Sequence, residues 1–168
     1  MKGDDIVLIG MPGVGKSTVG VILAKLKGKR FIDTDLVIQE RSGLLLSEII
    51  ERDGVDGFIA YEEDVVSTVK AENAVIATGG SVIYGAKAME HLATLGTVVF
   101  VDCSYDELAR RLGSLKNRGV VLREGQSLRT LYDERTPLYR ACADVTVDET
   151  GLDVEQTVLA IDAKTKGI

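Results

Sequence analysis

Cysteine and histidine are scarce in this chain. Its 168 residues include two cysteines and a single histidine. Cys103 and Cys142 fit neither a CxxC nor a Cys/His ligand spacing, which argues against a metal site of that kind. We expect each cysteine to pack as a small apolar residue, and we expect His91 to be structural because no Ser/Asp constellation lies near it.

Long apolar runs and an excess of positive charge are missing as well. No apolar stretch approaches the roughly 18 residues that are needed to span a bilayer. The first residues lead directly into an apolar strand pattern, without the hydrophobic segment of a signal peptide. The net charge of −6 argues against a nucleic-acid partner, which needs a basic face to replace counterions. We therefore expect a cytoplasmic protein that binds neither membranes nor nucleic acids.

What the sequence does have is an alternation of strand and helix patterns from end to end. This alternation favours an α/β fold in which helices cover both faces of a mostly parallel sheet. The length predicts one domain, residues 1–168. The predicted strands cover residues 6–9, 30–33, 74–77, 97–102 and 144–147, and the predicted helices cover residues 17–26, 90–95, 106–112, 127–141 and 154–163.

The clearest motif is a glycine-rich segment between the first predicted strand and helix. Residues 10–17 read GMPGVGKS and fit the phosphate-binding loop pattern GxxxxGK[ST] at every fixed position. Its backbone N–H groups would hold phosphate oxygens, its lysine would reach the β- and γ-phosphates, and its serine would bind Mg²⁺. The alternative is a glycine-rich turn that binds nothing. The expected nucleotide-binding residues here are Gly13, Val14, Gly15, Lys16, Ser17 and Thr18.

Two further constellations follow the second and third predicted strands. In open α/β sheets the ligand lies outside the carboxyl ends of the strands, so Asp33 and Asp35 should face the phosphate-binding loop. One carboxylate would hold Mg²⁺ and the other would accept a hydrogen bond or proton from an attacking hydroxyl, although such a pair can also simply cap a helix. Gly79 and Gly80 allow a ligand to approach the backbone closely, or they form a tight turn.

Residues 113–125 interrupt the alternation of strands and helices. This segment contains three glycines together with Lys116, Arg118 and Arg123, and it is too polar to be core. In a nucleotide-binding fold such a basic, glycine-containing segment is typical of a mobile lid, and the alternative is an ordinary surface loop.

The ordered set of motifs resembles the shikimate kinase family of small P-loop kinases over almost the whole chain. The resemblance depends on residues 10–17, 33–35, 79–80, 118–122 (RGVVL) and 134–139 (ERTPLY) running into Ala143 and Asp144. It implies a three-layer α/β/α P-loop kinase fold with a five-stranded parallel sheet. It also implies a substrate-binding region at about residues 34–62 and a flexible lid at about residues 113–125 that closes over ATP.

The resemblance also implies a role for individual residues. Lys16 and Arg118 would neutralise the phosphoryl group during transfer, and Asp35 would hold the substrate hydroxyls and orient the nucleophile. Ser17 and Asp33 would position Mg²⁺.

The remaining implied roles concern binding. Arg111 would stack on adenine, and Arg118 would contact the nucleotide as well. Arg135 would grip the substrate carboxylate, while Gly79 and Gly80 would contact the substrate through the backbone.

One segment departs from the family pattern. The family places an arginine directly after the phenylalanine of an FRxxE segment, where it shares the substrate carboxylate. Here residues 58–62 read FIAYE, so Ile59 takes the place of that arginine and cannot donate a hydrogen bond. Either Arg41 or Arg140 replaces the lost contact, or the pocket has changed to another hydroxyl-bearing substrate. In addition, Ser81 takes the place of the third glycine of a GGG segment.

These patterns predict a monomeric kinase that uses ATP and Mg²⁺. Its expected reaction is transfer of the γ-phosphoryl group to a hydroxyl of shikimate or of a shikimate-like small metabolite. A kinase for another small polyol or hydroxy acid is the first alternative. A nucleotide-binding regulatory protein without shikimate kinase activity is the second, and a nucleoside monophosphate kinase, which would need several arginines for a second phosphate, is the third.

Overall fold

The computed structural model describes residues 2–113, 120 and 122–167. Five strands form within these residues: β1 (Asp5–Ile9), β2 (Arg30–Asp33), β3 (Ala74–Ala77), β4 (Gly96–Asp102) and β5 (Val145–Asp148). The helices are α1 (Lys16–Lys27), α2 (Thr34–Ser42), α3 (Leu46–Val66), α4 (Ala86–Leu95), α5 (Tyr105–Gly113), α6 (Leu128–Cys142) and α7 (Val154–Lys164), with a short 3₁₀ helix, η1 (Val82–Tyr84).

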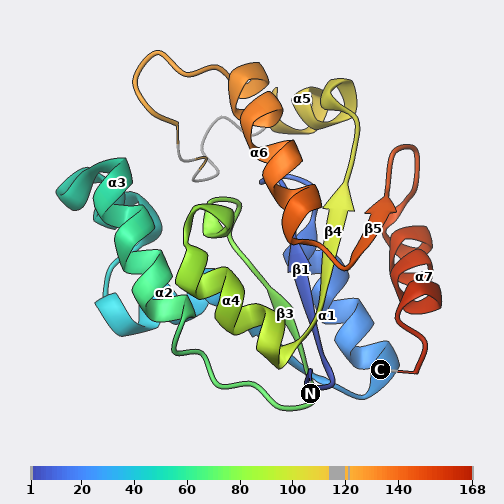
Figure 1. Cartoon of the computed structure of the whole chain (residues 1–168). Coiled ribbons are helices and arrows are strands. Elements are labelled where there is room, and N and C mark those ends of the chain that lie inside the picture. Colours follow the sequence, from blue (N-terminus) through green and yellow to red (C-terminus); the bar gives the residue numbers. More distant parts are fainter. Residues whose placement is uncertain (1, 114–119, 121, 168) are drawn as a thin grey trace.

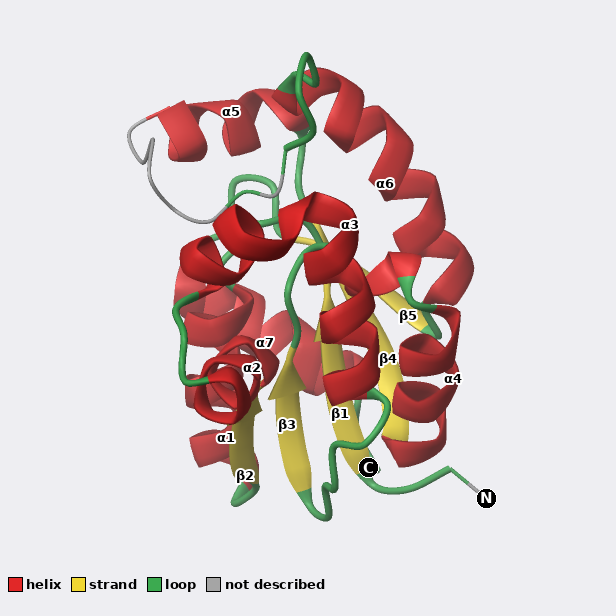
Figure 2. Cartoon of the chain, turned by 90° about the vertical axis from the view of Figure 1, so that its left-hand side faces the viewer, coloured by secondary structure: helices red, strands yellow, loops and turns green. Residues whose placement is uncertain are grey.

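The strands form one parallel sheet in the order β2-β3-β1-β4-β5. Helices α1 and α7 lie on one side of the sheet, and α4 and α6 lie on the other (Figures 1 and 2). This arrangement confirms the predicted three-layer fold with a five-stranded parallel sheet. Because all strands run in the same direction, their carboxyl ends meet at one edge of the sheet.

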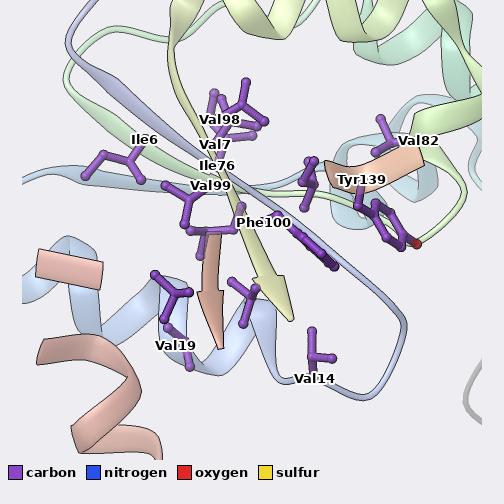
Figure 3. Close-up of a cluster of buried hydrophobic side chains, with 14 of the residues drawn as sticks. Ile6, Val7, Val14, Val19, Ile76, Val82, Val98, Val99, Phe100 and Tyr139 are labelled. Carbon is purple, nitrogen blue, oxygen red and sulfur yellow. The ribbon is translucent and has the colours of Figure 1, made fainter. Parts of the chain in front are cut away.

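Strand β1 is the centre of the hydrophobic core. Ile6, Val7, Leu8 and Ile9 are completely buried, because β1 has a strand on each side and helices over both faces. Figure 3 shows side chains of this core, including the ring of Phe100, which stacks on the ring of Tyr139 with 5.2 Å between the centroids. The rigid core fixes where β1 ends and the phosphate-binding loop begins.

The strands and helices with predicted bounds begin and end within one or two residues of those bounds, except that helix α4 begins at Ala86 and not at residue 90. No bounds were predicted for α2 and α3. The first turn of α4 is stabilised from outside the helix, since the Glu63 carboxylate accepts a hydrogen bond from the backbone N–H of Lys87 at 2.9 Å. This contact joins α3 to α4 and cannot be read from the local sequence pattern.

Helices α2 and α3 form a small second core beside the sheet. Ile38, Ile49, Phe58 and Val65 are buried together there, and Ile59 packs against them. Gly54 adopts a positive φ of 74° and interrupts α3, so the two halves of the helix can lie against different neighbours. This unit contains the residues 34–62 that were predicted to bind substrate.

The residues predicted to be structural are packed in the described part of the chain. Cys103 is buried in the main core and Cys142 packs against it. A ring nitrogen of His91 lies 2.7 Å from the carbonyl oxygen of Val69, so it joins α4 to the segment that follows α3. Within the described residues, every helix is too short or too polar to cross a membrane.

Candidate active site

A cavity of about 470 Å³ opens at the carboxyl ends of β1, β2 and β3. The phosphate-binding loop, α2, α3, the segment after β3 and α6 all contribute to its wall. The described lining residues are Pro12, Gly13, Gly15, Lys16, Ser17, Thr18, Asp35, Gln39, Leu45, Leu46, Ser47, Phe58, Glu62, Thr78, Gly79, Gly80, Ser81 and Arg135. The topology therefore brings together all three constellations that the sequence places after successive strands.

The phosphate-binding loop has the geometry that its glycines predict. Gly13 and Gly15 adopt φ angles of 90° and 81°, which side-chain-bearing residues rarely take. Val14, between them, is buried in the core (Figure 3), so its side chain anchors the loop. A Cβ on Gly15 would meet no atom within 4 Å, so the space beside this cavity-lining glycine is open to a phosphate group.

Lys16 begins helix α1 and turns back across the loop. Its Nζ donates hydrogen bonds to the carbonyl oxygens of Gly10 at 2.6 Å and Met11 at 2.8 Å, and the residue is only 7% exposed. Burial lowers the pKa of Lys16 to about 8, an effect that the nearby carboxylates of Asp35 and Asp33 oppose. An anionic ligand in the cavity would therefore gain a poorly solvated cation as its partner.

Asp33 performs two tasks at the end of β2. Its Oδ1 accepts a hydrogen bond from the backbone N–H of Asp35 at 3.0 Å and caps α2, while its Oδ2 accepts one from the Ser17 hydroxyl at 2.6 Å. Asp33 therefore caps helix α2, which was the alternative role for the acidic pair, and it also contacts Ser17 of the phosphate-binding loop. The adjacent oxygens of Ser17 and Asp33 fit Mg²⁺, which commonly uses one or two protein oxygens and takes its other ligands from phosphates and water.

Asp35 lies in the first turn of α2 and lines the cavity. Burial, together with the negative charge of Asp33, raises the pKa of Asp35 to about 6, and Lys16 opposes this rise. The carboxylate is therefore more basic than an exposed aspartate and lies where a substrate hydroxyl would have to meet the phosphate-binding loop.

Gly79 and Gly80 are crowded on the sides that face the site. A Cβ on Gly79 would lie 2.7 Å from Glu62 Oε2 and 2.8 Å from Asp35 Oδ1, and a Cβ on Gly80 would lie 2.7 Å from Pro12 Cδ and 3.1 Å from Arg135 Nη1. At Gly80 the ring of Pro12 leaves little room for a Cβ, whereas at Gly79 the crowding atoms are the ends of two side chains that could move aside. The two glycines allow these polar groups to lie close to the backbone at the cavity.

Arg135 is 2% exposed although it carries a full charge. Its guanidinium lies 5.3 Å from the ring centroid of Tyr84, and its Nε donates a long hydrogen bond of 3.4 Å to the Tyr84 hydroxyl. The residue lines the cavity from α6, so it presents a fixed positive charge opposite α3.

Comparison with known proteins identifies the family of this chain. The family model described as "Shikimate kinase" matches residues 12–165. A shikimate kinase of Thiobacillus denitrificans is 40% identical over 151 residues, which is 88% of this chain and 82% of the relative. The chain belongs to the shikimate kinase family.

Solved structures of the shikimate kinase family share the fold closely. The shikimate kinase from Acinetobacter baumannii in complex with shikimate is 35% identical, with a TM-score of 0.81 over 98% of this chain and 95% of that chain. The shikimate kinase from Aquifex aeolicus is 30% identical, with a TM-score of 0.77 over 98% of this chain and 99% of that chain.

In this shikimate kinase family member, Ile59 packs in the second core and is not among the described residues that line the cavity. The two residues proposed to replace an arginine there are used elsewhere. Arg41 donates a hydrogen bond to the Thr68 hydroxyl at 2.6 Å, and Arg140 forms an exposed ion pair with Asp102 at 3.0 Å. Among the described lining residues, the cationic side chains are Lys16 and Arg135.

Glu62 is a buried carboxylate of α3 that lines the cavity. It is 1% exposed, its Oε1 accepts a hydrogen bond from the Ser81 hydroxyl at 2.5 Å, and its Oε2 has no hydrogen-bond partner within the described residues. Burial raises the pKa of Glu62 to about 7, and the Ser81 hydrogen bond opposes this rise. The Ser81 hydroxyl therefore holds one of the two carboxylate oxygens of Glu62.

Arg111 lies on α5 beside the phosphate-binding loop but outside the set of lining residues. It forms ion pairs of 2.5 Å with Glu107 and with Glu149. Its proposed stacking on adenine stays a prediction.

The proposed lid is described only in part. Arg118 and Lys116 lie outside the described residues, so the proposed roles of Arg118 stay predictions. Of the rest of the segment, Arg123 forms an exposed ion pair with Asp56 of α3 at 2.8 Å.

Two tyrosines support the site, and the sequence patterns predicted a role for neither, although Tyr139 ends the ERTPLY motif. The Tyr139 hydroxyl donates a hydrogen bond to the carbonyl oxygen of Gly80 at 2.5 Å, and Tyr84 packs on Arg135. Tyr139 follows Arg135 by four residues on α6, so helical spacing could have placed both on one face. Tyr84 has no comparable signal, because η1 positions it through tertiary contacts.

Proposed function

We propose that this protein transfers the γ-phosphoryl group of ATP to a hydroxyl of shikimate or of a shikimate-like hydroxy acid. The observation that carries the proposal is the shared cavity. Lys16 and Ser17 of the phosphate-binding loop line the same space as Asp35 and Arg135, so a nucleotide and a small acceptor would meet there.

We assign the following roles. The backbone N–H groups of Gly13, Val14 and Gly15, with Thr18 at the mouth, bind the phosphates of ATP, and Lys16 neutralises charge on the transferred group. Ser17 and Asp33 hold Mg²⁺, which supplies further charge neutralisation when bound.

On the acceptor side, Asp35 orients the attacking hydroxyl and accepts its hydrogen bond, and Arg135 binds the carboxylate of the acceptor. Gly79 and Gly80 contact the acceptor through the backbone. Arg118 and Arg111 complete the nucleotide side, the first on the transferred group and the second on adenine.

Shikimate is the first acceptor to test, because the relatives are named shikimate kinases and one was solved with shikimate. Ile59 packs in the second core and cannot share the acceptor carboxylate with Arg135. This favours a second candidate, a different hydroxyl-bearing acid that does not need two arginines for its binding. A nucleoside monophosphate kinase fits less well, because Arg135 is the single arginine among the described lining residues. We also propose that the protein acts as a cytoplasmic monomer without a nucleic-acid partner.

Replacement of Lys16 tests the proposed chemistry. We expect Lys16→Ala to abolish acceptor-stimulated ADP formation, because Lys16 is the buried cation of the phosphate-binding loop and lines the cavity. Lys25→Ala, on the exposed side of the same helix, is the matched control and should keep normal turnover. Near-normal turnover of Lys16→Ala would refute the assignment.

A further inference from the structure

The orientation of the Arg135 guanidinium decides how well it can bind an acid. Arginine binds a carboxylate best through two parallel hydrogen bonds, so the plane of the guanidinium has to be fixed. Ile59 packs in the second core, and Arg135 is the single arginine among the described residues that line the cavity. The contacts that fix this one guanidinium therefore matter for an acidic acceptor.

Tyr84 contacts the guanidinium in two ways. The guanidinium carbon of Arg135 lies 5.3 Å from the centroid of the Tyr84 ring, and Nε donates a hydrogen bond to the Tyr84 hydroxyl at 3.4 Å. Nη1 of Arg135 lies beside Gly80, where a Cβ would be 3.1 Å away. Tyr84 thus engages one part of the guanidinium, while Nη1 lies at a glycine that lines the cavity.

Glu134 sets the direction of the Tyr84 hydroxyl. The hydroxyl donates a hydrogen bond to Oε1 of Glu134, which precedes Arg135 on α6. A phenol has one proton to donate, so this contact leaves the lone pairs of the oxygen for Nε of Arg135. Burial and the hydrogen bond to Glu134 both raise the pKa of Tyr84, so the hydroxyl keeps its proton at neutral pH.

The backbone that carries Tyr84 is anchored in the core. Val82 and Ile83 of η1 are buried, and the backbone N–H of Tyr84 donates a hydrogen bond to the carbonyl oxygen of Ser81 at 3.1 Å. Tyr84 itself is half-buried and is not among the described residues that line the cavity. An effect of Tyr84 on the acceptor would therefore pass through Arg135.

We propose that Tyr84 is a positioning residue for acceptor binding, which holds the Arg135 guanidinium in the orientation that receives the acceptor carboxylate. Glu134 fixes the Tyr84 hydroxyl as the hydrogen-bond acceptor for Arg135. This inference rests on the proposed phosphotransferase function and deepens its acceptor side. Without the Tyr84 hydroxyl the guanidinium is held less firmly, so part of the binding free energy of the acceptor would be used to order it.

The kinetic test pairs shikimate with its carboxamide, which keeps the ring and the hydroxyls but has no carboxylate. Tyr84→Phe keeps the aromatic ring and removes the hydroxyl. We expect KM for shikimate to rise about tenfold, while KM for ATP and kcat at saturating shikimate stay nearly constant. The carboxamide should be affected little, so the preference for the acid should shrink about tenfold. An unchanged preference in Tyr84→Phe would overturn the inference.

Tyr105→Phe is the matched control. Tyr105 also packs on an arginine, since the guanidinium carbon of Arg129 lies 4.7 Å from its ring centroid. Neither residue is among the described residues that line the cavity, so this variant should keep the preference for the acid. An equal loss of preference in both variants would also overturn the inference.

A double variant tests the part played by Glu134. Glu134→Ala should raise KM for shikimate severalfold, because the Tyr84 hydroxyl loses its fixed direction. Tyr84→Phe combined with Glu134→Ala should bind shikimate no more weakly than Tyr84→Phe alone, because Glu134 acts through the hydroxyl. Additive effects would overturn the role of Glu134.

A side-chain measurement tests the positioning of Arg135 without any acceptor. Its Nε–H signal in a nitrogen–proton correlation spectrum is identified by its loss in Arg135→Lys. Exchange of this proton with solvent should be about tenfold faster in Tyr84→Phe than in the wild type, because the hydrogen-bond acceptor is gone. Equal exchange rates would overturn the inference. Absence of turnover with every acceptor would instead refute the proposed function, and the exchange rates would still decide whether Tyr84 holds Arg135.

Discussion

At the scale of single residues, neighbouring carboxylates in the site differ in their surroundings. Asp33 is held by Ser17 and by the backbone of α2, whereas Asp35 is turned into the cavity. The first arrangement suits a residue that holds a cation, and the second suits one that orients a hydroxyl. Their separation by only two residues follows from the start of a helix directly at the end of β2.

Asp35 should therefore affect chemistry more than nucleotide binding. We expect Asp35→Asn to lower kcat by about a hundredfold, because the amide cannot accept the hydroxyl proton. The dissociation constant for ATP, measured by calorimetry, should change little. A variant in which ATP affinity falls and kcat stays normal would show that this role is wrong.

Glu62 should make the stability of the protein depend on pH. Its pKa in the folded protein is about 7, above the ordinary 4.5, and Asp35, Arg135 and Lys16 are the charged groups that influence it. A carboxyl whose pKa is raised stabilises the folded state fully below its unfolded pKa, and this contribution is lost as the pH rises through about 7. The glutamine in Glu62→Gln does not ionise, so the stability of this variant should not fall for this reason as the pH rises.

Urea unfolding at about pH 5 and about pH 8 measures the effect. Between these values the wild-type free energy of unfolding should fall by on the order of 2 kcal/mol more than that of Glu62→Gln. Equal changes in the two proteins would contradict the raised pKa. Glu51→Gln, on the exposed face of α3, is the control and should behave like the wild type.

Residues whose role is set by local sequence were predictable, and residues whose role depends on tertiary contacts were not. The positions of Lys16 and Ser17 follow from a contiguous motif between a strand and a helix. The state of Glu62 depends on Ser81, which lies nineteen residues away and approaches only in the folded chain. The sequence shows a glutamate at position 62, but it does not show that one oxygen of Glu62 has no hydrogen-bond partner among the described residues.

At the scale of elements, α6 connects the acceptor side of the site to the loop after β3. Arg135 and Tyr139 both come from α6, and the Tyr139 hydroxyl binds the carbonyl oxygen of Gly80. Helix α6 therefore positions the arginine and the glycine pair as one unit. The sequence predicted the helix but not its link to Gly80.

Loss of this link should weaken acceptor binding. Tyr139→Phe leaves the Gly80 carbonyl without its donor, so the free energy of unfolding should fall by about 1–2 kcal/mol. The KM for the acceptor should rise severalfold while the KM for ATP stays nearly constant. Tyr105→Phe is the control, because the Tyr105 hydroxyl makes no hydrogen bond among the described residues. An equal rise of both KM values would contradict this account.

At the scale of the whole molecule, the parallel sheet explains why distant motifs form one site. The phosphate-binding loop, the aspartates and the glycine pair follow β1, β2 and β3, and these strands are neighbours in the sheet. Strand and helix alternation predicts such a sheet, and the rule that ligands lie at the carboxyl ends then predicts the location of the site. What alternation cannot predict is the side-chain wall of the pocket, since α3 and α6 are brought there by packing.

The most direct measurement of the central claim is acceptor-dependent ADP formation with ATP and Mg²⁺ over a panel of shikimate, gluconate, homoserine and serine, with the product identified by mass spectrometry. The account predicts that at least one of these alcohols stimulates ADP formation and gains one phosphoryl group, and that Lys16→Ala forms no such product. Tight binding of ATP without stimulation by any alcohol would contradict the account and favour a nucleotide-binding regulator.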